Sequence, residues 1–106
     1  MGVYTEVDIY ATFETEEQAE KNIANLEDNV INFIKETEKG EFYFSINDCD
    51  LEDNLVIVKI SSGRYPNAEW QTEKIFEYLK TKDGLIEFEA SVMCPETIIH
   101  WDKDDE

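Results

Sequence analysis

The sequence is poor in basic residues. Nine lysines and arginines and a single histidine stand against 26 acidic residues, so the formal net charge is −17 over 106 residues. Nucleic-acid binding depends on Lys and Arg that neutralise phosphates, and anionic lipid attracts the same side chains. This deficit predicts direct contact neither with nucleic acid nor with a membrane.

Long apolar runs are missing, as is an N-terminal basic segment followed by an apolar one. A membrane span needs roughly 20 apolar residues, and a secretory signal needs both of those features. We therefore expect a cytoplasmic protein. Its two cysteines, Cys49 and Cys94, form no C-x-x-C pair, and we expect partly buried thiols rather than a disulfide.

Recognisable catalytic motifs are also lacking. There is no glycine-rich phosphate loop, no G-x-S-x-G and no H-E-x-x-H. Pro95 lies between Cys94 and His100, and no orienting acid accompanies that pair, so it predicts no nucleophilic site. We expect a protein that is not an enzyme, with no catalytic residues, no cofactor and no metal site.

A short acidic stretch leaves one question open. Residues 48–53 alternate carboxylates in a way that resembles the start of a calcium loop, but Asp53 stands where such loops need glycine and Lys59 where they need the last glutamate. We expect a solvated loop, and weak divalent-cation binding by residues 48–53 stays an open alternative.

The elements that are present follow a regular order. A Thr15-x-x-Gln18 capping box and an apolar stripe predict a first helix that runs to about Glu38 and stops at Gly40. A second helix is predicted after Pro66 and ends by Gly84. Alternating or continuous apolar residues predict four strands, at 3–13, 42–46, 55–60 and 86–92, with a polar loop at 47–54.

This β-α-β-β-α-β order is typical of the α+β ferredoxin-like sandwich, in which two helices cover one face of a four-stranded antiparallel sheet. Right-handed crossovers place the first and third strands in the centre. Thr97–Trp101 is predicted either as a short C-terminal edge strand or as a packed arm. We expect a single α+β domain over residues 1–101 and an acidic tail over 102–106.

The uncovered face of such a sheet is the first candidate for recognition. It combines carboxylates with tyrosines, and this favours contact with a basic protein because Tyr is a frequent interface hot spot. Alternatively, the tyrosines only stabilise a solvated face. The residues predicted there are Tyr4, Glu6, Asp8, Tyr10, Tyr43, Ser45, Lys59, Glu87 and Glu89.

Three other groups complete the candidate partner-binding residues. Trp70 is predicted to point away from the core, as an anchor among acids or beneath a neighbouring loop or the C-terminal arm. A row of glutamates on one flank of the first helix is either a phosphate-like track or an ordinary solvated surface. The remaining candidates are Asp48, Asp50 and Glu52 in the acidic loop, and Glu16, Glu20, Glu27 and Glu38 on the helix.

High negative charge, small size and the lack of catalytic motifs predict an inhibitor that docks on a basic partner, as a monomer or weak homodimer. An immunity protein that neutralises a nuclease-type toxin fits this description best, and a phage anti-restriction mimic of nucleic acid shares the same physics. A different hypothesis is an oligomeric regulatory or small-ligand domain whose Thr97–Trp101 arm supplies a pairing edge. The acid excess can also serve solubility alone. Frequent Lys, Asn, Ile and Glu are typical of a bacterial or phage source.

Overall fold

The computed structural model describes residues 5–42, 44–63, 65–93 and 97–103. These residues form five strands and three helices. In chain order the elements are β1 (Thr5–Phe13), α1 (Glu16–Ile23), α2 (Leu26–Thr37), β2 (Asp48–Glu52), β3 (Leu55–Ser62), α3 (Tyr65–Lys80), β4 (Leu85–Met93) and β5 (Thr97–Asp102).

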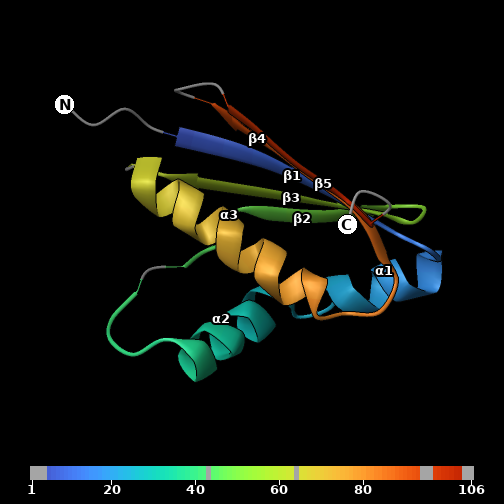
Figure 1. Ribbon diagram of the computed structural model, residues 1–106, viewed down its shortest axis with the longest axis horizontal. Coiled ribbons are helices and arrows are strands. Elements are labelled where there is room, and N and C mark those ends of the chain that lie inside the picture. Colours follow the sequence, from blue (N-terminus) through green and yellow to red (C-terminus); the bar gives the residue numbers. More distant parts are fainter. Residues whose placement is uncertain (1–4, 43, 64, 94–96, 104–106) are drawn as a thin grey trace.

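The strands form one antiparallel sheet in the order β2-β3-β1-β4-β5. The helices lie together on one side of this sheet (Figure 1). Helices α1 and α3 pack directly against strands, whereas α2 packs on α3. No described helix covers the opposite face of the sheet. Of the described helices, none is both long enough and apolar enough to cross a membrane.

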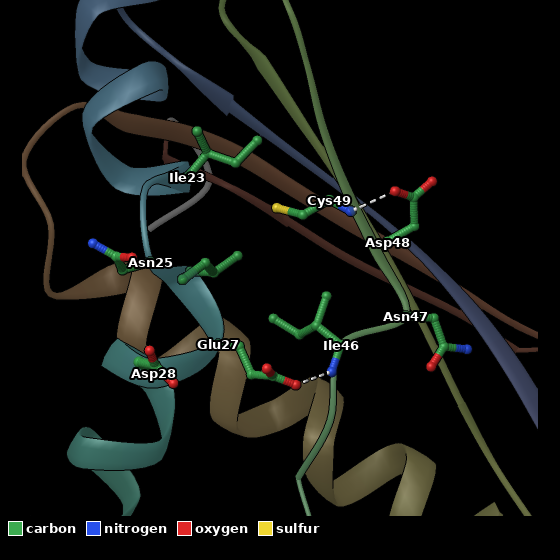
Figure 2. A pocket seen from close by; sticks show the side chains of 9 residues that line it. Ile23, Asn25, Glu27, Asp28, Ile46, Asn47, Asp48 and Cys49 are labelled. Atoms are coloured by element: carbon green, nitrogen blue, oxygen red, sulfur yellow. Dashed lines mark hydrogen bonds between the residues drawn. The ribbon is translucent and has the colours of Figure 1, made fainter.

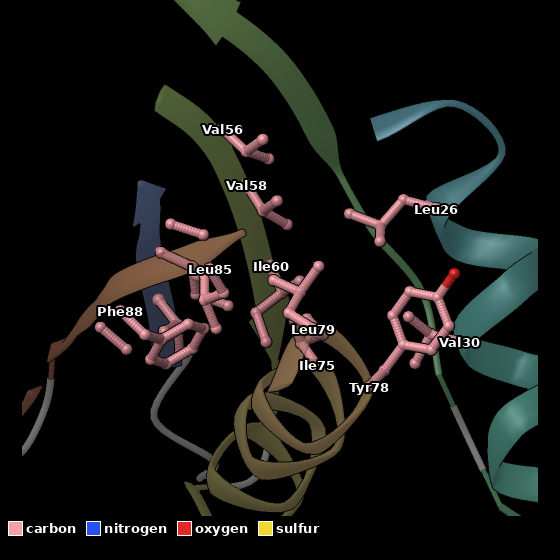
Figure 3. Close-up of a cluster of buried hydrophobic side chains, with 14 of the residues drawn as sticks. Leu26, Val30, Val56, Val58, Ile60, Ile75, Tyr78, Leu79, Leu85 and Phe88 are labelled. Atoms are coloured by element: carbon pink, nitrogen blue, oxygen red, sulfur yellow. The ribbon is translucent and has the colours of Figure 1, made fainter. Parts of the chain in front are cut away.

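The hydrophobic core lies between the sheet and α3. Every second residue of β1 points toward the helices, and Ile9 and Phe13 have no exposed surface. They belong to the same buried cluster as Ile75 and Leu79 from α3 and Phe88 from β4. Figure 3 shows these last three side chains, which have no exposed surface. Burying a side chain of this size contributes about 1.5–3 kcal/mol, so the alternation within β1 fixes which face of the sheet is left for solvent.

Three predicted strands and one helix start are confirmed. β1, β3 and β4 lie where alternation or β-branched runs placed them, and β3 is an interior strand. The capping box at the start of α1 is present, because the Thr15 hydroxyl accepts from the Gln18 N–H while the Gln18 side chain accepts from the Thr15 N–H. Local patterns therefore locate these elements correctly.

The predicted four-stranded, two-helix ferredoxin-like sandwich is wrong, because the sheet has five strands and the helices number three. The predicted first helix is interrupted at Asn25, whose φ of 54° lies in the left-handed region that Asn tolerates better than most residues. The turn at Asn25 separates α1 from α2. Beyond β4, the chain adds β5 as an edge strand, which is the first of the two alternatives predicted for Thr97–Trp101.

The predicted strand at 42–46 is also wrong. Its described residues lie outside the sheet, and Phe44 is buried. The backbone N–H groups of the two residues that follow Phe44 donate to side-chain oxygens. Gln71 Oε1 accepts from the Ser45 N–H at 3.1 Å and Glu27 Oε1 from the Ile46 N–H at 2.8 Å. Strand β2 instead forms from residues predicted as a loop, Asp48–Glu52, through a tight turn at Asp53.

Candidate functional site: an acidic sheet face

The face of the sheet opposite the helices is lined mainly by carboxylates. Strand register aligns Asp48, Lys59 and Asp8 in one row across β2, β3 and β1. Because side chains alternate between faces, residues two positions along each strand add the next rows. We call this surface the acidic face; its carboxylates are Glu6, Asp8, Asp48, Asp50, Glu52, Glu87, Glu89 and Asp102.

The charges on the acidic face are poorly balanced. Lys59 lies directly opposite Asp8 on one side and Asp48 on the other, an arrangement that is favourable for a sheet. Across β4 and β5, however, Glu87 lies directly opposite Asp102. Facing like charges destabilise a sheet by several tenths of a kcal/mol. The folding of the sheet therefore does not require this concentration of acid.

Apolar and aromatic groups interrupt the carboxylates. Tyr10 is half-buried in the middle of the face and pairs across the strands with Ile57 and Glu89. At the β5 edge, Ile98 keeps 62% of its surface exposed. An aromatic centre surrounded by charged groups is a common composition for a protein-binding surface.

A shallow hollow of about 270 Å³ lies on this face beside Lys59. Its carboxylates come from β1 and β2, and residues 59–61 of β3 also line it. Its size suits one long basic side chain. The polar lining residues are Glu6, Asp8, Asn47, Asp48, Lys59 and Ser61.

The predicted row of glutamates on the first helix does not exist as one surface. Glu16 and Glu20 lie exposed on α1. Beyond the break at Asn25, the Glu27 carboxylate accepts from the Ile46 N–H, and Glu38 pairs with Lys74 at 2.7 Å. Both of these carboxylates therefore take part in contacts within the fold, and the break at Asn25 places them on, or at the end of, a different helix from the one that carries Glu16 and Glu20.

Trp70 is half-buried on α3. Its ring lies 6.0 Å from that of Phe42, and the Lys74 Nζ lies 5.9 Å from its centroid. Phe42, in the segment that follows α2, therefore packs on Trp70. Ser45, predicted on the open face, lies near α3 on the helix side. Tyr4 and Tyr43, two other predicted members of that face, lie outside the described residues.

A pocket of about 380 Å³ opens where α1 ends and α2 begins (Figure 2). Ile23, Leu26 and Ile46 give it apolar walls, and the Cys49 thiol points into it. Burial, followed by the negative charges of Asp48 and Asp50, raises the pKa of this thiol to about 11. A raised pKa leaves less thiolate at neutral pH, and this lowers the nucleophilicity of Cys49.

We expect Cys49 to react slowly with iodoacetamide in the folded protein. A pKa near 11 instead of 9.0 leaves roughly 100-fold less thiolate at pH 8. The measurement compares the alkylation rate of folded and urea-unfolded Cys94→Ser protein, in which Cys49 is the reacting thiol. Equal alkylation rates in the two states would show that the folded protein does not suppress ionisation of the Cys49 thiol.

One grouping was missed at the sequence level. His100 on β5 lies beside Glu87 and Asp102, whereas the sequence pointed only to the Cys94/His100 pair. Cys94 lies outside the described residues. The i, i+2 spacing of His100 and Asp102 would have indicated a shared face, but only once residues 97–102 were known to form a strand.

Comparison of this chain with family models, with curated proteins and with solved structures finds no match.

Proposed function

We propose that this chain is a non-catalytic, cytoplasmic protein that docks its acidic face onto a basic surface of a partner protein. The observation that carries the proposal is the cross-strand register, which gathers carboxylates from four strands on the face that no described helix covers. Such a surface repels phosphate and attracts Lys and Arg.

The dimensions of the acidic face suit a protein partner. Five strands about 4.8 Å apart and about 25 Å long give an area of roughly 600 Å². A standard interface takes about 800 Å² from each partner. Loops at the rim of the sheet would supply the remainder.

The centre of the face supplies both an anchor and a recess. Tyr10 offers a large contact area with few torsions to fix, which favours a hot spot. A basic side chain from the partner would enter the hollow beside Lys59 and meet the carboxylates of Asp8 and Asp48. Removing one partner of a desolvated charge pair costs more than removing a charge at the rim, so changes at Tyr10 and at the hollow should weaken binding most.

Proteins that bind nucleic acid carry basic surfaces of this kind, because Lys and Arg neutralise the phosphates. Blocking that surface would inhibit it stoichiometrically. An immunity protein against a nuclease-type toxin is the role we favour, and a phage inhibitor of a restriction enzyme would use the same chemistry. Both act as carboxylate mimics of a phosphate backbone.

The test is affinity capture from the source organism with the immobilised chain at 50 and 500 mM NaCl. We expect one basic protein to be retained at low salt and released at high salt, because screening shortens the range of the acidic field. Size-exclusion chromatography of the purified chain supplies the second reading. A salt-insensitive homodimer without a basic partner, paired through the exposed Ile98 edge, would contradict the proposal.

A further inference from the structure

Three side chains at the β4–β5 end of the acidic face lie close enough to share a cation. Glu87, His100 and Asp102 each offer one ligand atom, and these atoms all lie within 4.8 Å of one another. The Nε2 of His100 is 4.0 Å from Oε2 of Glu87. Glu87 and Asp102 are direct cross-strand partners and His100 lies two residues along β5, so all three point to the same side.

The ligand set suits a divalent cation of borderline softness. One imidazole nitrogen and two carboxylate oxygens are common ligands of Zn²⁺, at about 2.0–2.2 Å each. A tetrahedral ion at that range needs ligand atoms about 3.4 Å apart. The side chains of Glu87 and His100 are 47% and 46% exposed, so small rotamer changes can close the difference.

The electrostatic setting also favours a cation. Glu87 and Asp102 face each other as like charges, and Glu89 lies directly opposite His100 as a third carboxylate. A bound cation would remove the repulsion across the β4–β5 ladder.

We propose that Glu87, His100 and Asp102 form an exchangeable Zn²⁺ site on the acidic face. Three protein ligands leave a fourth position open to water or to a ligand from a partner. The histidine distinguishes specific binding at this site from nonspecific attraction of cations to an acidic surface, because imidazole favours Zn²⁺ over Mg²⁺. The site does not depend on docking of a basic protein.

Calorimetric titration of the untagged, chelator-treated protein with ZnCl₂ tests the proposal, with MgCl₂ titrated in parallel. We expect one Zn²⁺ per chain, bound at least 10-fold more tightly than Mg²⁺. His100→Ala and Glu87→Gln should each weaken Zn²⁺ binding at least 10-fold, because each removes one of three ligands.

Asp50→Asn is the matched control, since it removes one carboxylate from the same face on β2. It should change Zn²⁺ affinity less than threefold. Backbone amide spectra recorded with substoichiometric Mn²⁺ should show the strongest broadening at Glu87, His100 and Asp102. Equal affinity for Zn²⁺ and Mg²⁺, unchanged by His100→Ala, would overturn the proposal and leave only diffuse attraction to an acidic protein.

Discussion

Replacing Asp8, Asp48 and Asp50 together by Asn is expected to weaken binding to the captured basic partner at least about 100-fold. Each carboxylate that meets a basic group at an interface typically contributes more than about 1 kcal/mol, and three such losses exceed the 2.7 kcal/mol of a 100-fold change. These residues line the β1–β2 side of the acidic face, two of them at the hollow. Titration calorimetry at 150 mM NaCl measures the change.

Asparagine is the appropriate replacement because its amide oxygen still accepts hydrogen bonds. Asp48 Oδ1 accepts from the Cys49 N–H at 3.0 Å, and Asn can keep that contact in β2. The variant should therefore remain folded, as circular dichroism would show.

The control carries the same change of net charge on the helix side. Glu17, Glu36 and Glu73 are exposed on α1, α2 and α3, and replacing all three by Gln should reduce affinity less than fivefold. If both triple variants lose affinity equally, the partner responds to total charge and the acidic face is not the docking site. If neither loses affinity, the partner binds elsewhere on the chain.

The sequence predicts elements well where a local pattern and the final packing agree. β1 alternates over its whole length, and its inward residues are the ones buried against α3. Its outward residues Glu6, Asp8 and Tyr10 lie on the open face as predicted. One buried face is enough to specify such a strand, because a shift of one residue would expose its whole apolar set.

Residues 42–54 show why local sequence patterns did not predict the remaining elements. Phe42, Phe44 and Ile46 alternate like a strand, but side-chain acceptors from α2 and α3 bind the backbone N–H groups of residues 45 and 46. The described residues of this segment therefore lie outside the sheet. The true strand, β2, alternates more weakly through Cys49 and Leu51. Its signal was the Asp-Asn turn at 53–54, a pair that tolerates the left-handed backbone of a tight hairpin.

The candidate site depended on long-range register more than on composition. Asp48 and Asp50 were identified as acidic residues of interest, but only pairing of β2 with β3 places them beside β1. Likewise, His100 joins Glu87 because β5 pairs antiparallel with β4. Cross-strand neighbours come from segments distant in sequence, and no helical or strand periodicity encodes which segments will pair.

The second large effect concerns Lys74, which joins two helices. Its Nζ lies 2.7 Å from Glu38 at the end of α2 and 3.1 Å from Glu77 on α3, and 11% of its side chain is exposed. Lys74→Ala should lower the free energy of unfolding by about 2 kcal/mol, between the values for exposed and buried ion pairs. Because α2 packs on α3, its amides should lose protection from hydrogen exchange before those of the sheet.

Lys74→Met separates charge from packing, since methionine fills similar space without an ammonium group. It should lower the free energy of unfolding by about 1 kcal/mol.

The hydrogen bond to Glu38 is the main cause that raises the Lys74 pKa above its ordinary value of 10.5. A lysine whose pKa is higher in the folded state than in the unfolded state stabilises the fold fully at any pH below its unfolded-state pKa. This contribution is lost as the pH rises through its folded-state pKa. The stability difference between wild type and Lys74→Met, measured by urea unfolding, should thus stay constant up to about pH 10 and shrink above pH 10.5. A difference that is independent of pH across this range would mean that the charge of Lys74 does not contribute to holding α2 against α3.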